Sequence, residues 1–151
     1  MTMTQITINK LRSLPCILAT AACVVTLLAC DNGEEKDVER SAGDFAAAYF
    51  NLRYARAAEL STPDSEKWIR FKASNITQAD LDVYNSAQDT ATCTVNGMEI
   101  CGDSAIVAMT VNNVLVMDSI GKVANICKER DYRLILKKKE GKWAVRLSSV
   151  L

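Results

Sequence analysis

The chain contains no histidine, only two prolines and no net formal charge. The missing histidine removes the commonest metal ligand and the commonest general base near neutral pH. Any catalysis would have to rest on carboxylates, tyrosines, lysines or a thiol, so the sequence favours a protein that is not an enzyme. The balance of 18 basic and 18 acidic side chains gives no general attraction to phosphate backbones. We therefore expect no cofactor, no metal site and no nucleic-acid partner.

Charge is also absent from residues 13–29, which follow Lys10 and Arg12. A basic start, a short apolar middle and a small residue at the end are typical of a secretory signal peptide. The alternative is a permanent membrane helix, but a span needs about 20 apolar residues. This run is shorter and contains Pro15. Removal of residues 1–29 would leave 122 residues with 16 basic and 18 acidic side chains, enough for one domain.

The end of this leader, Leu27-Leu28-Ala29-Cys30, resembles a bacterial lipobox, in which a leucine, a middle residue and a small residue precede the cysteine. The resemblance implies that Cys30 begins the mature protein and carries a diacylglyceryl thioether and an amide-linked acyl chain such as palmitate. Two or more chains anchor a protein stably, at about 0.8 kcal/mol per buried methylene. Thr20-Ala21-Ala22-Cys23 is a weaker competitor, because it lacks the leucine and would leave an apolar segment on the mature protein.

Residues 30–37 comprise the lipidated cysteine and a polar segment with four acidic side chains. Such a segment is typical of a flexible tether. The acidic run also resembles the export tag that sends some lipoproteins to the outer face of the outer membrane. An aspartate directly after the cysteine, here Asp31, instead resembles an inner-membrane retention signal. We expect an envelope protein held to the membrane by Cys30, with the outer membrane favoured and neither of its faces preferred.

The first half of the remaining chain has helical periodicity. Apolar residues recur at steps of three and four, the pattern of an amphipathic helix: Val38, Ala42, Phe45, Tyr49 and Leu52. Residues 55–60 continue as a second short helix or as a bent extension of the first.

Two further start signals follow. Thr62 can cap a helix that has Pro63 at its first position, and Trp68, Ile69 and Phe71 supply its apolar side. Another helix starts at Thr77, because Asp80 is placed three residues on as in a capping box. We expect about three helices in this half.

From Thr90 the pattern changes to the alternation of strands. Residues 101–104 form a tight turn around Gly102, which sets Ile100 opposite Ala105 and Met98 opposite Val107. The alternation slips at Asn96-Gly97, where a bulge or a tighter turn would account for it.

Later turns are expected at residues 118–121 and 139–142. Pairing Lys138 with Trp143 places one set of side chains on the buried face: Tyr132, Leu134, Leu136, Trp143, Val145 and Leu147. The predicted fold class is α+β, with about three N-terminal helices packed on a curved four-stranded antiparallel sheet, as a single domain over residues 38–151.

This order of elements resembles the nuclear-transport-factor-2-like superfamily, whose domains have the cystatin-like cone shape, and its uncharacterised secreted lipoproteins in particular. The likeness lies in residues 45–60, Thr62-Pro63, residues 132–136 and Gly141-Lys142-Trp143. Arg53 departs from the pattern, since relatives often have an acidic residue there. The resemblance implies a cone whose open mouth can hold a small apolar molecule. Some members are isomerases, cyclases or dehydratases.

Five residues are candidates for the lining of such a pocket: Tyr49, Trp68, Tyr84, Met109 and Trp143. The alternative for large apolar side chains is core packing. Three cysteines remain in the domain, which allows one disulfide, but the predicted register offers no pair and we expect buried or free thiols: Cys93, Cys101 and Cys127.

These observations favour a lipid-anchored envelope protein that binds a small apolar ligand or a protein. The alternative is a small cone-fold enzyme of the isomerase or dehydratase type. Pairing of two copies through the outer face of the sheet is a third expectation, and an exposed apolar patch at residues 106–108 would favour it.

Overall fold

Helix α1 spans Asp31–Phe50 in the computed structural model, which describes residues 31–151. The predicted stripe is buried: Val38, Ala42 and Phe45 are 0% exposed and Tyr49 is 2% exposed. Residues 31–37, which we assigned to the tether, are helical and belong to α1. Glu35–Leu151 forms one compact unit, and the description below concerns that unit. The predicted leader and Cys30 lie outside the described residues.

The end of α1 differs from the prediction, because Leu52 lies outside the helix. Leu52 has φ 59°, the left-handed conformation. The Leu52 N–H donates to the Tyr49 carbonyl at 3.3 Å and the Arg53 N–H to the Ala48 carbonyl at 2.8 Å. These two bonds form a Schellman motif, which usually has glycine at the left-handed position. A leucine at this position gives no sequence signal for the helix end.

The following segment contains α2 (Tyr54–Glu59), the 3₁₀ turn η1 (Pro63–Ser65), α3 (Glu66–Ser74) and α4 (Gln78–Ser86). The described residues thus contain four α-helices where we predicted about three, because the left-handed Leu52 separates α2 from α1. The capping box of α4 is confirmed: the Asp80 N–H donates to Thr77 Oγ1 at 3.3 Å and the Thr77 N–H donates to Asp80 Oδ2 at 2.7 Å. Thr62 makes no such cap, because its hydroxyl lies 2.7 Å from Ser65 Oγ.

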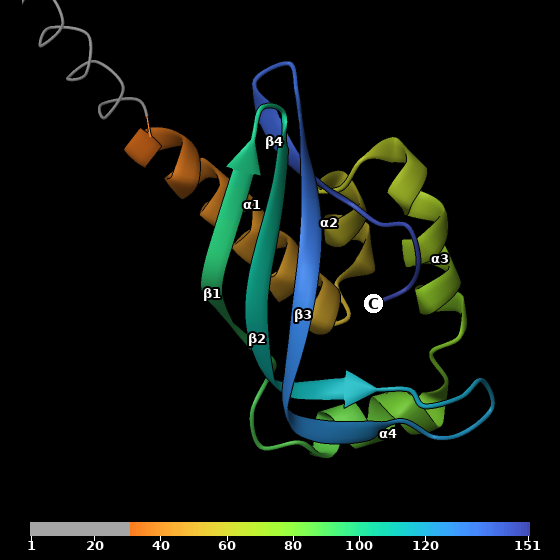
Figure 1. Cartoon of the computed structure of the whole chain (residues 1–151). Helices are drawn as coiled ribbons and strands as arrows, with labels where there is room; N and C mark the ends of the chain where they lie inside the picture. The colour runs from red at the N-terminus through yellow and green to blue at the C-terminus, as the bar shows by residue number, and fades with distance from the viewer. Residues whose placement is uncertain (1–30) are drawn as a thin grey trace, which may run out of the picture. The chain divides into compact units, whose positions relative to one another are not determined.

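Four antiparallel strands form one open sheet in the order β1-β2-β3-β4: β1 (Thr92–Cys101), β2 (Ser104–Val116), β3 (Asn125–Lys139) and β4 (Lys142–Arg146) (Figure 1). The predicted register is confirmed, with Ile100 opposite Ala105 and Lys138 opposite Trp143. Of the two explanations for the slip at Asn96-Gly97, the bulge is correct, since the β1–β2 register shifts between Val95 and Gly97.

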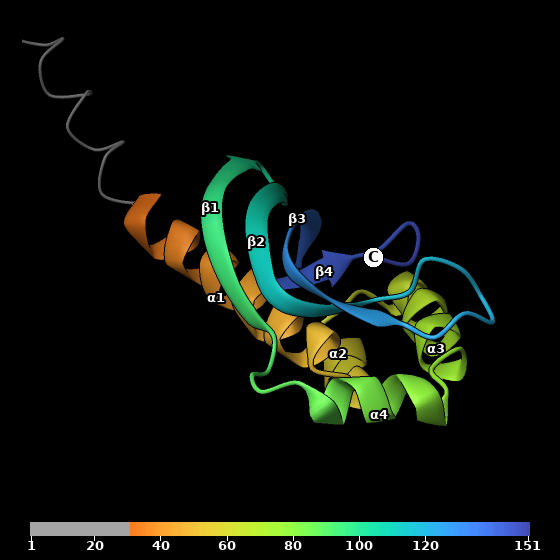
Figure 2. The ribbon, with the colours of Figure 1, turned by 90° about the horizontal axis from the view of Figure 1, so that it is seen from below.

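The strands curve around α1 (Figure 2). Side chains of the inner sheet face pack with the α1 stripe into a single core that includes Val107, Met109, Leu134 and Val145. Strand β2 changes direction at Asn113, whose φ of 55° lies in the left-handed region that asparagine tolerates. Its last residues and the start of β3 run across α4 (Figure 1). The result is an α+β fold with helices packed on one face of the sheet.

None of the helices within residues 31–151 is long and apolar enough to cross a bilayer.

Candidate functional site

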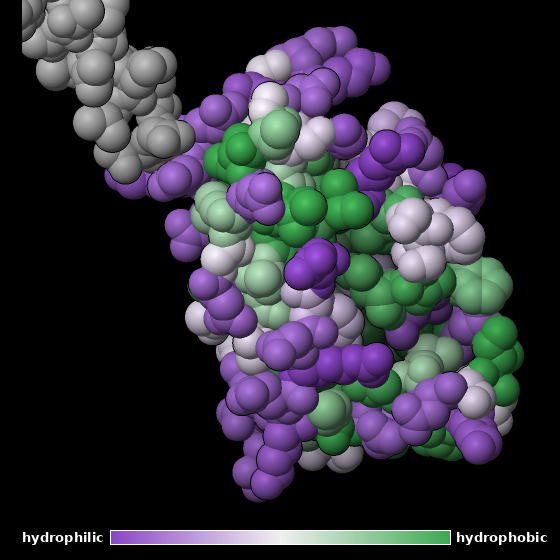
Figure 3. All heavy atoms as spheres, viewed as in Figure 1, coloured by the Kyte–Doolittle hydropathy of each residue, from purple (hydrophilic) through white to green (hydrophobic). Residues whose placement is uncertain are grey.

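A cavity of about 350 Å³ opens between α3, the end of β2 with the loop after it, and the C-terminal segment. Figure 3 shows hydrophobic and polar side chains around a hollow on this face. The bend at Asn113 carries the end of β2 toward α3, and Tyr132 of β3 forms part of the wall. The lining consists of Phe71, Lys72, Asn75, Leu115, Val116, Met117, Asp118, Ser119, Ile120, Arg130, Tyr132, Val150 and Leu151.

Much of this lining is apolar and in contact with water. Phe71 is 48% exposed and Ile120 is 73% exposed. We expected Phe71 on the apolar, packed side of its helix, but its ring lies at the cavity instead. Covering such side chains with an apolar molecule contributes roughly 25 cal/mol per Å² of apolar surface removed from water. The lining therefore favours a ligand with an apolar body.

Two cations share the cavity with these apolar groups. Lys72 comes from α3 and Arg130 from β3. The Arg130 guanidinium lies 5.7 Å from the centre of the Tyr132 ring, which orients it. Burial lowers the pKa of Lys72, the positive charge of Arg130 lowers that pKa further, and Asp80 partly opposes both effects. Lys72 thus carries its charge at a partly buried position in a cavity that it shares with a second cation.

A smaller cavity of about 10 Å³ adjoins the first and shares four of its lining residues: Lys72, Leu115, Tyr132 and Leu151. Tyr49 and Tyr54 also line this smaller cavity. The Tyr49 hydroxyl accepts the Leu151 N–H at 3.3 Å, and burial raises the pKa of Tyr49 to about 12. Tyr54 Oη is buried and is the one such side-chain atom of residues 31–151 without a hydrogen-bond partner. Burial also raises the pKa of Tyr54.

Asp80 is the buried carboxylate of the domain, 1% exposed, and its oxygens are already in use. Oδ1 accepts the Ala124 N–H at 2.7 Å, and Oδ2 accepts the Thr77 N–H at 2.7 Å and the Thr77 hydroxyl at 2.8 Å. These bonds from Ala124 and Thr77 lower the pKa of Asp80. The side chain joins α4 to the segment before β3, and this role leaves no capacity for acid–base chemistry at the cavity.

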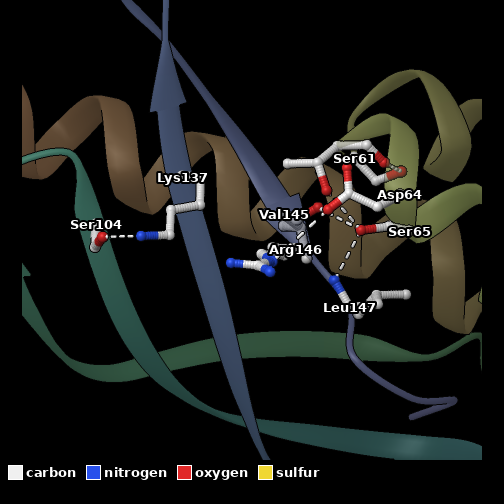
Figure 4. Close-up of polar contacts among 9 residues, drawn as sticks. Ser61, Asp64, Ser65, Ser104, Lys137, Val145, Arg146 and Leu147 are labelled. Atoms are coloured by element: carbon white, nitrogen blue, oxygen red, sulfur yellow. Dashed lines mark hydrogen bonds and ion pairs between the residues drawn. The ribbon is translucent and has the colours of Figure 1, made fainter.

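A second polar cluster surrounds Ser65, which is 0% exposed (Figure 4). Its Oγ accepts the Leu147 N–H at 2.8 Å and lies 3.4 Å from the Val145 carbonyl. The Thr62 N–H donates to that carbonyl at 2.9 Å, and the Val145 N–H donates to the Leu60 carbonyl at 3.1 Å. Ser65 therefore holds the segment before α3 against β4, and its hydroxyl is engaged rather than poised as a nucleophile.

Lys137 Nζ donates to Ser104 Oγ at the hairpin end of the sheet (Figure 4). A serine–lysine pair can act as nucleophile and base when the lysine is desolvated. Here both side chains are partly exposed and neither lines the cavity. We assign this contact to cross-strand pairing.

The five candidate lining residues do not line one cavity together. Tyr49 lines the smaller cavity, while Met109 and Trp143 are buried in the core at 1% and 8% exposure. Trp68 is half-buried against the core, with Lys67 Nζ 5.1 Å from its ring centre. Tyr84 donates to Asn51 Oδ1 at 3.0 Å. The structure brings none of these four to the cavity walls described here.

Sequence reasoning missed Lys72, Arg130 and the residues after Asn113. Lys72 and Arg130 are ordinary charged residues in their own segments, and nothing local relates one to the other. A signal did exist in the Asn112-Asn113 pair, since asparagine is infrequent within strands and tolerates positive φ. That signal would have indicated the bend but not the cavity.

No group of three or more carboxylate or cysteine side chains suited to a metal ion occurs within residues 31–151. Cys93, Cys101 and Cys127 are free thiols, as we predicted. Burial raises the pKa of Cys93 to about 11, which disfavours the reactive thiolate.

Comparison with known proteins identifies no family. No family model matches the chain, and no curated protein matches it. Among solved structures, it is similar to the solution structure of a SEC-C motif containing protein from Rhodopseudomonas palustris, with 13% identity and a TM-score of 0.39 over 70% of this chain and 71% of that one. A likeness at this level carries no argument about function, which leaves the cavity as the basis for a proposal.

Proposed function

We propose that this chain is a bacterial envelope lipoprotein whose domain binds a small apolar molecule and catalyses no reaction. The observation that carries the proposal is the cavity beside α3, where exposed Phe71 and Ile120 meet Leu115 and Val116 around about 350 Å³. That volume lies at the lower end of the range for small-molecule pockets. Because Phe71 and Ile120 in the lining are exposed, the cavity opens to solvent and a ligand can enter and leave it.

We also propose a fold family for the domain and a place for the protein in the cell envelope. A cystatin-like cone of the nuclear-transport-factor-2-like superfamily is supported by helices that precede a curved antiparallel sheet. The anchor is lipid on Cys30, supported by the lipobox resemblance, and the outer membrane is favoured by the acidic residues that follow.

A cone enzyme of the isomerase or dehydratase type has less support. Such a reaction needs an acid or base beside the ligand. The Asp80 oxygens are occupied by Ala124 and Thr77, and Asp118 at the cavity accepts a hydrogen bond from Asn125 at 3.3 Å. Because both carboxylates already accept hydrogen bonds within the domain, ligand binding without catalysis has more support than an enzymatic reaction.

The binding proposal is tested with a neutral ligand. The full chain, reconstituted in phospholipid nanodiscs, is titrated calorimetrically with 4-phenylbutanol, and the heat of empty nanodiscs is subtracted. Ile120→Ser removes an apolar lining residue and should weaken binding severalfold. Val123→Ser, at a 58% exposed residue outside the lining, is the matched control and should leave binding unchanged. No saturable binding to the wild-type chain of 4-phenylbutanol or of a charged analogue with the same apolar body would refute the proposal.

The anchor is tested separately by mass spectrometry of the native protein. We expect a chain that begins at Cys30 and carries acyl chains. Cys30→Ser should abolish membrane retention, whereas Cys23→Ser, at the competing site, should retain it. An unmodified chain that begins before Cys30 contradicts this assignment.

Pairing of two copies is a further part of the proposal. Ile106 and Ile135 lie opposite each other on the outer sheet face and are 39% and 42% exposed. This apolar pair supports a homodimer through that face. Sedimentation should give a dimer for the wild-type chain and a monomer for Ile106→Lys, and a monomeric wild-type chain would refute it.

A further inference from the structure

The cavity beside α3 combines an apolar lining with more basic than acidic side chains. Lys72 and Arg130 are its basic side chains and Asp118 is its acidic side chain. Asp118 is engaged with Asn125. Within residues 31–151 neither cation forms an ion pair. Both basic side chains of the cavity therefore lack a direct ion-pair partner among the described residues.

The positions of the two cations make this excess significant. They come from α3 and β3, segments that only the tertiary fold brings together, and both line the same cavity as Tyr132. Burial and the charge of Arg130 both act to lower the pKa of Lys72. Holding two like charges together at a partly buried site costs free energy. A bound anion would offset that cost, because it interacts favourably with both groups.

Asp80 does not supply the missing anion. It attracts Lys72 from outside the cavity lining, and its oxygens accept the Ala124 N–H and the Thr77 N–H instead of pairing with the lysine. The adjoining cavity of about 10 Å³ is lined by Tyr54, whose Oη is a neutral donor without a partner among the described residues. The polar groups in and around the cavity thus favour a negatively charged headgroup.

We infer that the ligand is an amphipathic anion, with a carboxylate or phosphate headgroup held by Lys72 and Arg130 and a single apolar body lying against Phe71, Leu115 and Ile120. The inference rests on the proposed binding function and names the class of ligand for the same cavity. A volume of about 350 Å³ suits one short chain or one aromatic ring with a linker, rather than a lipid with two long chains.

The test compares ligands that share one apolar body. The full chain in zwitterionic nanodiscs is titrated with 4-phenylbutyrate, 4-phenylbutyl phosphate and the neutral 4-phenylbutanol. Charge-assisted hydrogen bonds contribute enough for roughly a tenfold preference for an anion over the alcohol. A preference between the carboxylate and the phosphate then identifies the headgroup.

Charge variants show whether these two side chains are responsible. Lys72→Gln and Arg130→Gln should each remove most of the preference for the anions, measured as the ratio of the anion affinity to the alcohol affinity of the same variant. Arg130→Lys should restore part of it. Lys67→Gln on α3 and Arg133→Gln on β3 lie outside the lining and are the matched controls, which should keep the full preference.

Three results overturn the inference in distinguishable ways. If the alcohol binds as tightly as the anions, the cavity binds apolar molecules and the charge assignment is wrong. If none of the three ligands binds, the proposed function fails together with the inference. An anion preference that persists in both Lys72→Gln and Arg130→Gln would place the anion at another site.

Discussion

Tyr49 and Tyr54 lie edge to face, with ring centres 5.7 Å apart, but their hydroxyl groups differ in their partners. Tyr49 Oη accepts the Leu151 N–H, whereas Tyr54 Oη is buried without a partner among the described residues. A buried hydroxyl without a hydrogen bond costs free energy because it has lost its water.

Replacement of the unpaired hydroxyl should stabilise the domain. Tyr54→Phe is expected to raise the free energy of unfolding by about 1 kcal/mol. Tyr49→Phe should lower it by about 1 kcal/mol, because the Leu151 N–H loses its acceptor. Urea denaturation of the two variants measures both changes. A loss of stability in Tyr54→Phe equal to that in Tyr49→Phe would show that the Tyr54 hydroxyl has a partner.

Asp80 illustrates the opposite case, a buried charge with all its partners. Asp80→Asn places an amide NH₂ group where N–H and O–H donors already point, and should lower the free energy of unfolding by about 3 kcal/mol. Asp82→Asn, on the exposed side of the same helix and bonded only to Gln78 Nε2 at 2.9 Å, should change it by less than about 0.5 kcal/mol. Thermal unfolding tests both. Equal effects of the two variants would contradict the role assigned to Asp80.

At the scale of elements, β4 and η1 stabilise each other. β4 has only five residues, and on its free side the Leu60–Thr62 segment pairs with Val145 as a short parallel bridge. Ser65 extends this contact through its bond from the Leu147 N–H. The edge of the sheet is thereby covered, which protects it from pairing with another chain.

Ser65→Ala should weaken the contact between η1 and β4. The Leu147 N–H would lose its acceptor, so its hydrogen exchange should accelerate and the free energy of unfolding should fall by about 2 kcal/mol. Ser61→Ala is the control, since Ser61 Oγ donates mainly to the nearby Ala58 carbonyl at 3.0 Å. Unchanged protection of Leu147 in Ser65→Ala would show that the serine is dispensable for holding β4.

At the scale of the whole domain, buried phenols and thiols determine the response to alkaline pH. Tyr49 has its pKa raised from 10.0 to about 12, and Cys93 from 9.0 to about 11, both chiefly by burial. A raised pKa in the folded state stabilises the domain fully below the unfolded pKa. That contribution is lost as the pH rises toward the folded pKa.

The domain should therefore lose stability between about pH 9 and pH 12. Tyr49 alone accounts for a loss on the order of 2 kcal/mol, because one pKa unit corresponds to about 1.4 kcal/mol. Urea denaturation at a series of pH values measures the slope, and Tyr49→Phe should flatten it above pH 10. A stability that stays constant up to pH 12 would contradict the burial of these groups.

Asp80 affects the stability at acid pH. Its lowered pKa stabilises the domain above about pH 4, and this contribution is lost as the pH falls through the pKa of the folded state.

The sequence by itself determined the parts of this protein that depend on neighbours along the chain. The stripe from Val38 to Tyr49, the capping box at Thr77 and Asp80, and the β1–β2 turn at Gly102 follow from helical or strand periodicity and from the φ angles that single residues allow. Gly102 and Gly141 have φ values of 60° and 77°, so the turns set the register and the register sets the buried face.

Only the tertiary structure decided where a ligand can bind. Leu52 in the left-handed conformation and the bend at Asn113 are tolerated because the surrounding packing compensates for their strain. The cavity then joins residues from four separate stretches, 71–75, 115–120, 130–132 and 150–151. No local period relates Lys72 to Arg130, because their proximity arises from the path of the chain between them. A cavity between segments that are distant in sequence exists only in the packed fold. Its size and its charged groups therefore depend on the tertiary structure.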